Sequence, residues 1–531
     1  MTDVNWDELH LVENPAVEVL SERLGYAYVP PEELEGDRES PTSAVLTKRL
    51  ERKLRELNPW ISDENVKSAI RAVTYPEAAS LVEANEQVYT HIVHTLSRPQ
   101  DLGDGLGLKG RDISFIDFDH PDRNEFLVTR QFYVKGPKEG IKPDIVLFVN
   151  GLPLVVIECK SPTIEHPIEE GIKQLRRYQE ADDEFKGRGA AQLFNTAQIV
   201  ISTCADKARY GTVLTPPKWF FGWNEPYPLT LEALRAELGR MPKEQDVLFY
   251  GMLKPDILLD LVRHFFAFEV SQGRAIKKIA RYQQYRAVCK ALGRIAEARK
   301  PDRRGGIVWH TQGSGKSLTM LWTALKLRRL YENPLIAVVT DRVDLDEQIV
   351  GTFRRCGFPN PGQAGSAAQL YGWLNEGGGR TILTTIHKFE DRNLADEVRN
   401  EGRNVFVLVD EAHRTQYGNL AAKMRRALPN ACFLGFTGTP IDKKDRSTRR
   451  VFGEYLDTYT IEEAERDGAT VRIFYESRLA ELQVEGNTLD ALFEWAFKDL
   501  SPEQREQLKD RYAAKAAVAQ APERIRAIAL D

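Results

Sequence analysis

A chain of 531 residues is too long for a single hydrophobic core, and its length predicts about three domains. It has no apolar run near the roughly 20 residues that a membrane-spanning helix needs, and its acidic, polar start is unlike a signal peptide. The net charge of −5 does not indicate a nucleic-acid-binding surface, and the cysteines, scattered without CxxC pairs, argue against zinc and disulfides and suit a reducing cytoplasm. We therefore expect a cytoplasmic protein of several domains with no membrane partner.

Residues 1–100 combine amphipathic helical patterns with turns. From Val12 to Leu24 apolar residues recur at helical spacing, and Gly25 stands where a helix would stop. The composition then shifts towards Val, Ile and Phe with turn residues between apolar runs, which is typical of strands. We predict strands at 112–118, 125–134, 144–149, 152–159 and 197–203, and a helix over Glu169–Glu180.

Two carboxylates and a lysine lie at the ends of two adjoining predicted strands. Asp144 opens the first strand, Asn150-Gly151 predicts a hairpin turn, and the returning strand ends in Glu158-Cys-Lys160. Side chains alternate along a strand, so Glu158 and Lys160 share a face. A strict two-residue turn would set Asp144 opposite Ile157, on the wrong face. We therefore expect a three-residue loop or a bulge that sets Asp144 opposite Glu158.

Such a group of side chains can bind Mg²⁺, position water and stabilise the charge that develops at phosphorus. A surface salt bridge at the end of a sheet is the alternative interpretation. The following helix favours the catalytic one, because Gln174 and Tyr178 are four residues apart and lie on one helical face.

From about residue 270, short buried-type strands alternate with helices, as in a parallel α/β sheet. The charged tail from 476 to 531 reads as helical and contains no further strand of this kind. The predicted strands of this region are 306–311, 335–341, 380–386, 405–413 and 432–440.

A phosphate-binding loop follows the first of these strands and precedes a helix. In HTQGSGKS, backbone N–H groups can converge on phosphate oxygens at the helix N-terminus. Lys316 would reach the β- and γ-phosphates of ATP, and Ser317 would hold Mg²⁺. His310 stands where the first glycine of such loops is usual. The remaining residues of the loop are Thr311, Gln312, Gly313, Ser314 and Gly315.

Two later strands end in complementary groups. The DEAH sequence supplies Asp410, placed to bind the Mg²⁺ shell, and Glu411, placed to polarise the attacking water. The TGTP sequence supplies hydroxyl groups at the tip of the next strand.

These motifs resemble helicase superfamily 2. The resemblance implies that Asp410 and Glu411 form the Walker B pair and that His413, Thr437 and Thr439 couple hydrolysis to DNA movement. It also implies an adenine-reading element at Arg281 and Gln284, with Gln283 as a competing choice, and DNA-backbone contacts at 340–348 and 384–388.

The earlier motif, Asp144 with Glu158-Cys-Lys160 and Gln174…Tyr178, resembles the PD-(D/E)xK nucleases in their variant with a QxxxY helix. Glu13 stands where such nucleases often carry one more acidic residue. The fold class implied is α/β: a nuclease domain over 1–265, a RecA-like P-loop domain with a parallel sheet over 266–475, and a helical linker over 476–531.

The order of all the motifs resembles the restriction (R) subunit of type I restriction-modification enzymes. The resemblance implies an ATP- and Mg²⁺-dependent endonuclease and translocase that acts on double-stranded DNA together with modification and specificity subunits. Such a motor has a second RecA-like domain. No helicase motif follows Pro440, so we expect that domain to be missing from this chain. A stand-alone repair helicase-nuclease and a non-translocating binding fragment remain the alternatives.

Overall fold

The computed structural model describes residues 8–101, 107–271, 273–298, 300, 303–341, 343–359, 361–389, 399–412, 417–439, 448–472, 498 and 500–506. The chain divides into two compact units, Met1–Thr470 and Val471–Asp531. Most of the predicted helical tail, like His413, lies outside the described residues. Among the helices described, none is long and apolar enough to cross a membrane.

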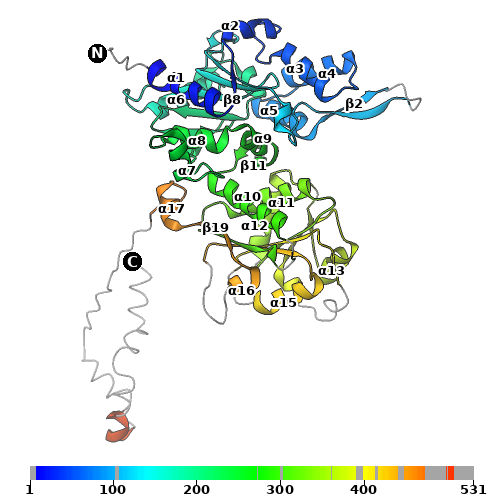
Figure 1. Ribbon diagram of the computed structural model, residues 1–531. Coiled ribbons are helices and arrows are strands. Elements are labelled where there is room, and N and C mark those ends of the chain that lie inside the picture. The colour runs from blue at the N-terminus through cyan, green and yellow to red at the C-terminus, as the bar shows by residue number, and fades with distance from the viewer. Residues whose placement is uncertain are drawn as a thin grey trace. The chain divides into compact units, whose positions relative to one another are not determined.

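The first half of the larger unit is built on a six-stranded mixed sheet (Figure 1). Its central strands β4, β7 and β8 are antiparallel neighbours, and β9 runs parallel to β8. Helix α6 (Pro167–Tyr178) packs against β9. The strands, in their order across the sheet, are β1 (Ala27–Tyr28), β4 (Phe126–Arg130), β7 (Ile145–Val149), β8 (Leu152–Cys159), β9 (Ile199–Thr203) and β10 (Ala208–Gly211).

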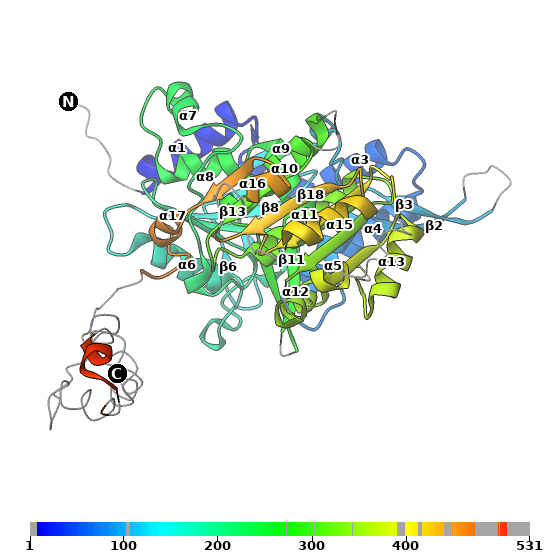
Figure 2. The same cartoon turned by 90° about the horizontal axis from the view of Figure 1, so that it is seen from below.

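Two strand predictions in this half were wrong in extent. The strand expected over 112–118 ends at Ile113, because β3 (Lys109–Ile113) pairs with β2 (Leu96–Gln100) in a separate ribbon. This ribbon projects from the rest of the unit in Figures 1 and 2. The run 125–134 is divided between β4 and β5 (Val134–Lys135), since Gln131 takes a left-handed conformation with φ +52° that a strand does not continue through. Strand β5 pairs with β6 (Gly140–Ile141).

The hairpin between β7 and β8 has the irregularity that the sequence predicts. Val149 pairs with Leu152 across a two-residue turn in which Asn150 and Gly151 both have positive φ. The pairing then shifts, with Phe148 opposite Pro153 but Leu147 opposite Val155, so Leu154 is the extra residue of a bulge. From there Ile145 faces Ile157, and the same register sets Asp144 opposite Glu158. The predicted bulge is confirmed.

The second half is built on a seven-stranded sheet in which every neighbouring pair is parallel, as the alternation of strands and helices predicts. Parallel strands place their carboxyl ends at one edge, where the phosphate loop, Asp410 and Thr437 therefore meet. The order of the strands is β15 (Gly362–Gln363), β16 (Thr381–Thr385), β14 (Leu335–Thr340), β17 (Val405–Asp410), β18 (Cys432–Thr437), β13 (Gly306–His310) and β19 (Tyr455–Tyr459).

Helices surround both sheets (Figures 1 and 2). The N-terminal segment consists of a π-helical turn, η1 (Leu9–Glu13), then α1 (Asn14–Glu18) and a second π-helical turn, η2 (Val19–Arg23), and it ends before Gly25 as expected. The others are α2 (Pro31–Leu34), α3 (Thr47–Leu57), α4 (Asp63–Thr74), α5 (Leu81–His94), α7 (Leu231–Leu238), α8 (Glu244–Met252), α9 (Pro255–His264), α10 (Tyr282–Glu297), α11 (Lys316–Leu330), α12 (Val343–Arg355), α13 (Ala367–Glu376), α15 (Tyr417–Ala427), α16 (Thr448–Phe452) and α17 (Ile461–Arg466).

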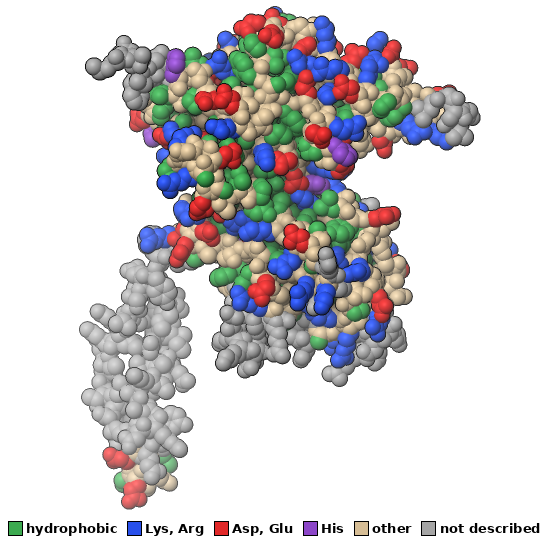
Figure 3. Space-filling view, viewed as in Figure 1, with side chains coloured by type: hydrophobic (Ala, Val, Ile, Leu, Met, Phe, Trp, Pro, Cys, Tyr) green, Lys and Arg blue, Asp and Glu red, His purple; other side chains and the backbone are tan. Residues whose placement is uncertain are grey.

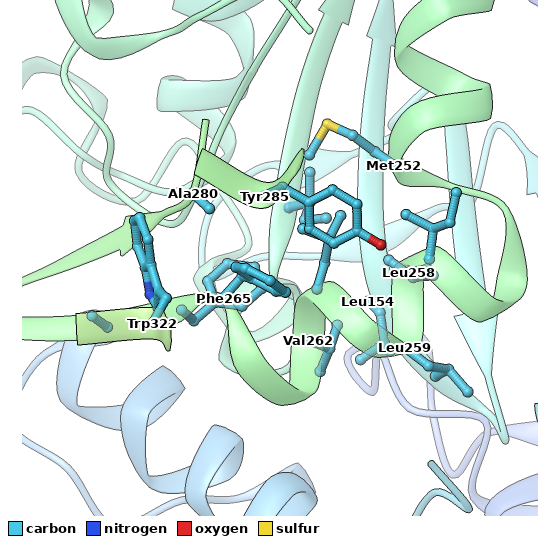
Figure 4. Packing of buried hydrophobic residues seen from close by; sticks show 14 of the residues in the cluster. Leu154, Met252, Leu258, Leu259, Val262, Phe265, Ala280, Tyr285 and Trp322 are labelled. Atoms are coloured by element: carbon cyan, nitrogen blue, oxygen red, sulfur yellow. The ribbon is translucent and has the colours of Figure 1, made fainter. Parts of the chain in front are cut away.

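A single apolar cluster extends from the six-stranded sheet to the helices of the seven-stranded sheet. It passes through α8 and α9 and beside the hairpin of β11 (Phe266–Ser271) and β12 (Arg274–Ile279). Figure 4 shows its middle, where Phe265 and Tyr285 lie with ring centroids 4.8 Å apart. Domain limits at 265 and 475 stay predictions. The side chains labelled in Figure 4 are Leu154, Met252, Leu258, Leu259, Val262, Phe265, Ala280, Tyr285 and Trp322.

Candidate functional sites

The β7–β8 hairpin brings the predicted carboxylates and the lysine together. Lys160 Nζ lies 2.6 Å from Glu158 Oε1 and 4.0 Å from Asp144 Oδ2. Asp144 is held in place because its Oδ2 accepts a hydrogen bond of 2.7 Å from the backbone N–H of Cys159. Asp144 and Glu158 are both buried. The three groups therefore form one compact site rather than a solvated surface ion pair.

Burial sets the charge balance of this group. It raises the pKa of Glu158 well above its ordinary value, and the neighbouring charge of Asp144 adds to the rise. Burial also raises the pKa of Asp144, against the opposing hydrogen bond from Cys159. Burial alone would lower the pKa of Lys160, but the charge and hydrogen bond of Glu158 raise it overall. Lys160 therefore stays protonated, and its charge compensates the carboxylates.

The N-terminal segment adds two more carboxylates to the site. Glu8, Glu13 and Asp144 each offer a carboxylate oxygen, and these oxygens lie within 4.8 Å of one another. Gln131 connects two of them, because its Nε2 lies 3.0 Å from Asp144 Oδ1 and 3.3 Å from Glu13 Oε2. The expectation for Glu13 thus agrees with its position, whereas sequence reasoning missed Glu8.

The π-helical turn explains why Glu8 was missed. A regular α-helix turns about 100° per residue, so two residues five apart point in clearly different directions. The i→i+5 hydrogen bonding of a π-helix brings such residues onto one face. Leu9–Glu13 forms this kind of turn, and the carboxylates of Glu8 and Glu13 face the same group.

The two residues predicted on the helix after the motif also lie at the site. Gln174 Nε2 donates a 2.5 Å hydrogen bond to the hydroxyl of Tyr178 on α6. Burial, followed by the charge of Glu158, raises the pKa of Tyr178, so this hydroxyl stays protonated near the carboxylates. The helix lies close to the sheet at Gly171, where an added Cβ would lie 2.3 Å from Ser202 Oγ and 3.6 Å from Lys160 Cγ. Tyr178 therefore lies close enough to Glu158 for that charge to act on its hydroxyl, and Gln174 is hydrogen bonded to it.

The oxygen-rich site fits a hard divalent cation such as Mg²⁺. Glu158 Oε2 is buried and has no hydrogen-bond partner among the described residues. A carboxylate oxygen withdrawn from water and left unpaired is costly, and a bound cation would satisfy it. The residues that would hold such a cation are Glu8, Glu13, Asp144 and Glu158.

The second site lies at the carboxyl edge of the seven-stranded sheet. The loop of Thr311–Gly315 connects β13 to α11, and Gly313 and Gly315 have positive φ values of +79° and +85°. Such conformations turn backbone N–H groups towards one point and favour glycine. Ser314 stabilises the loop internally by donating from Oγ to Thr311 O at 2.6 Å. Lys316 and Ser317 then open α11, as a phosphate-binding loop requires.

The strand ends next to the loop bring the other predicted groups within reach. The charge of Lys316 acts on Asp410, whose pKa burial and the charge of Glu411 nevertheless raise to about 6. Glu411 has a positive φ of +49°, unusual for a residue with a side chain. A Cβ added to Gly438 would lie 3.3 Å from Lys316 Nζ, which places the Thr437–Thr439 segment beside the lysine. Within the segment, the Thr439 N–H donates to Thr437 Oγ1 at 3.2 Å.

Gln284, rather than Gln283, reaches the phosphate loop. Its Nε2 donates to Gly315 O at 3.1 Å and lies 3.3 Å from Ser314 O, and its Oε1 accepts from the Arg281 N–H at 2.8 Å. The amide of Gln283 is buried and has no partner among the described residues. The contacts therefore favour the Arg281 and Gln284 assignment.

The comparisons with known proteins match both parts of the chain. Residues 6–219 match the family described as type I restriction enzyme R protein N terminus, and residues 283–506 match the SWI2/SNF2 ATPase family. A putative type I restriction enzyme MjaIXP endonuclease subunit of Methanocaldococcus jannaschii is 32% identical over 96% of this chain and 50% of its own length. The type I restriction enzyme HindI endonuclease subunit of Haemophilus influenzae is 35% identical over 85% of this chain and 44% of its own length.

The chain is a relative of type I restriction endonuclease subunits. The resemblance expected from its motifs is confirmed, and the chain spans about half the length of the curated restriction subunits it matches. Solved structures that resemble it include a Type ISP restriction-modification enzyme LlaBIII bound to DNA (17% identity, TM-score 0.29, 37% of this chain and 16% of that one). Another is the UvsW helicase from bacteriophage T4 (18% identity, TM-score 0.27, 36% of this chain and 62% of that one).

Proposed function

We propose that the chain is the nuclease and first motor portion of an ATP-dependent type I restriction endonuclease subunit, which cleaves double-stranded DNA with Mg²⁺ in complex with modification and specificity subunits. The observation that carries the proposal is the bulge at Leu154, which sets Asp144 opposite Glu158 beside Lys160. A hairpin without function would gain nothing from burying two carboxylates and a lysine at the same end of the sheet.

In the nuclease site, Mg²⁺ bound to the carboxylates would supply Lewis-acid stabilisation of a phosphodiester oxygen. Lys160, held protonated by Glu158, is placed to stabilise the negative charge that develops at phosphorus. The Cys159 N–H and Gln131 fix the two oxygens of Asp144, so this ligand needs no reorganisation on binding. Tyr178, which Gln174 orients, supplies a protonated hydroxyl at the edge of the site.

In the nucleotide site, ATP would lie with its phosphates on the Gly313–Lys316 loop. The backbone N–H groups and Lys316 would bind the β- and γ-phosphates, while Ser317 and Asp410 would hold Mg²⁺. Glu411 would orient the attacking water. Thr437 and Thr439, beside Lys316, would sense whether the γ-phosphate is present.

Cleavage of a plasmid that carries the target sequence tests the nuclease site, with the chain assembled with its modification and specificity subunits in Mg²⁺ and ATP. Asp144→Asn, Glu158→Gln and Lys160→Ala should each abolish cleavage, because each removes a cation ligand or the compensating charge. Lys173→Ala is the matched control, since Lys173 is exposed on the same helix as Gln174. Full cleavage by any of the three variants would remove that residue from the site.

Binding of fluorescent ADP tests the nucleotide site on the same preparations. Lys316→Ala should bind the nucleotide much more weakly, since no neutral residue replaces the charge on the phosphates, while Lys173→Ala should bind normally. Co-purification of the tagged chain with the modification and specificity subunits tests the partners. A chain that cleaves DNA in their absence would instead support a stand-alone helicase-nuclease.

A further inference from the structure

One stacked pair of residues connects the two halves of the larger unit beside the phosphate loop. The guanidinium carbon of Arg281 lies 3.6 Å from the centroid of the Phe221 ring. This is van der Waals contact between a planar cation and an aromatic face, the geometry of a strong cation–π interaction. Both residues fall between the two family matches, which end at 219 and begin at 283.

Phe221 is held rigidly by the six-stranded sheet. Its backbone makes two hydrogen bonds to Tyr210 of β10, with Tyr210 N donating to Phe221 O at 2.9 Å and Phe221 N donating to Tyr210 O at 3.1 Å. The ring of Trp219 lies against it, with centroids 6.2 Å apart. Phe221 therefore presents a fixed aromatic surface to Arg281.

Among the described residues, no carboxylate lies within 4 Å of the Arg281 guanidinium, although this side chain is largely withdrawn from solvent. Burial lowers its pKa, and Tyr210, Tyr459 and Asp467 only partly offset this. Phe221 covers one face of the guanidinium. A second planar group could stack on the opposite face.

The position of Arg281 indicates which planar group that is. Its backbone N–H binds Gln284, and the Gln284 amide contacts the carbonyls of Ser314 and Gly315 in the phosphate loop. At the start of the loop, the Thr311 N–H donates to Tyr459 O, and Tyr459 lies close enough to act on the pKa of Arg281. We expect a nucleotide with its phosphates on the loop to have its base within reach of Arg281.

We propose that Phe221 is a positioning residue for the purine base of the nucleotide: it fixes the Arg281 guanidinium so that the base stacks on the opposite face. The inference rests on the proposed nucleotide site and extends it, because it makes the six-stranded sheet part of that site. It requires Phe221 to affect the binding of the base and not that of the phosphates.

Two ligands separate the contributions of the base and the phosphates in this chain of 531 residues. Fluorescent ADP reports base and phosphate binding together, and inorganic tripolyphosphate, used as a competitor with Mg²⁺, reports phosphate binding alone. Phe221→Leu should weaken ADP binding by about 2-fold to 30-fold, the range expected from losing one cation–π contact, and leave tripolyphosphate binding unchanged. Phe221→Tyr, which keeps the aromatic face, should bind both ligands as the parent chain does.

The outcomes distinguish this inference from the proposed function. If Phe221→Leu binds ADP normally while Lys316→Ala does not, the inference is wrong and the nucleotide site stands. If Phe221→Leu weakens both ligands equally, or Phe221→Tyr fails like Phe221→Leu, Phe221 acts only through the fold and the inference is again wrong. If Lys316→Ala binds both ligands normally, the nucleotide site itself is wrong.

Discussion

His310 and Asp457 are hydrogen bonded to each other, with 2.8 Å between Nε2 and Oδ2, and both side chains are fully buried. Arg286 and Lys290 of α10 also bind the carboxylate of Asp457, at 2.7 and 2.9 Å. The Asp457 carboxylate thus connects its own strand β19, at the edge of the sheet, to helix α10 and to the last residue of β13. The phosphate loop starts directly after that residue. This explains why a histidine stands at the first position of the loop, where glycine is usual.

Replacing Asp457 with Asn should strongly destabilise the protein. The variant would leave the Arg286, Lys290 and His310 side chains without their shared carboxylate, and removing one partner of a buried ion pair costs about 3–5 kcal/mol. Denaturant unfolding followed by circular dichroism measures the loss. Asp122→Asn is the matched control, because Asp122 is exposed. A loss no greater than that of the control would contradict the account of the network.

The same pair predicts a pH dependence of stability. Burial, together with the charges of Arg286 and Lys316, lowers the pKa of His310 below its ordinary value of 6.5 despite Asp457. As pH falls through about 6.5, the unfolded chain therefore binds a proton that the native chain does not, and native stability falls by up to about 1.4 kcal/mol per pH unit. Asp457 does not contribute in this range, since its pKa is lowered to about 2 from 3.8 and its stabilisation is lost only at more acidic pH.

Unfolding free energies of the parent chain and His310→Asn, measured at about pH 5 and about pH 7, test this dependence. The variant has no imidazole to protonate, so its stability should change less between the two conditions. Equal changes in the two proteins would show that His310 does not titrate on unfolding.

Deleting Leu154 should leave the pairing of Asp144 with Glu158 intact, because Leu154 is the extra residue of the bulge and has no partner on β7. Without it, Leu147 still faces Val155 and Ile145 still faces Ile157, so the hairpin becomes regular with no change of register. The deletion variant and Leu154→Ala should therefore both cleave DNA, although the loss of the buried leucine in Leu154→Ala should cost about 2–5 kcal/mol. Plasmid cleavage and thermal melting of both variants test this. Loss of cleavage in either variant while that protein is folded would contradict it.

Glu8→Gln and Glu13→Gln should each weaken Mg²⁺ binding. Burial raises the pKa of both carboxyl groups, and nearby Asp144 adds to the rise. A bound cation would offset both effects, because it favours the charged carboxylates. The Mg²⁺ concentration that gives half-maximal cleavage should rise for both variants and stay unchanged for Glu18→Gln, a control at an exposed position of α1. An unchanged Mg²⁺ requirement in Glu8→Gln would limit Glu8 to its protein contacts, a 3.1 Å hydrogen bond accepted from the Ser161 N–H and an ion pair of 4.0 Å with Lys160.

Periodicity and register carried most of the information that the sequence held about these sites. Strand period and turn length predicted a three-residue loop or a bulge between Asn150 and Glu158, because only one register puts Asp144 on the face of Glu158, and the structure has the bulge. The meeting of the phosphate loop, Asp410 and Thr437 at one edge could be predicted in the same way, since parallel strands have their carboxyl ends at the same edge of a sheet. These are constraints of local geometry, and a single sequence contains them.

What could not be predicted depends on departures from regular geometry or on distant contacts. Glu8 joins Glu13 only through a π-helical turn, which has no clear sequence signal. Asp457 is the only charged residue of its strand, YLDTY, and its burial depends on Arg286, Lys290 and His310, which come from elsewhere in the chain. Phe221 stacks on a residue 60 positions away, and only the fold brings the two together. On the face shown in Figure 3, basic and acidic side chains are interspersed, which agrees with the weak charge signal of the composition.

The apolar cluster shared by the two sheets has a mechanical consequence. Tyr285 and Trp322 on one side and Leu154, Leu258 and Phe265 on the other belong to a single buried apolar cluster. A displacement at the carboxyl edge of one sheet is therefore transmitted to the other sheet, because close-packed side chains have low compressibility. Heating should accordingly melt both sheets in one calorimetric transition.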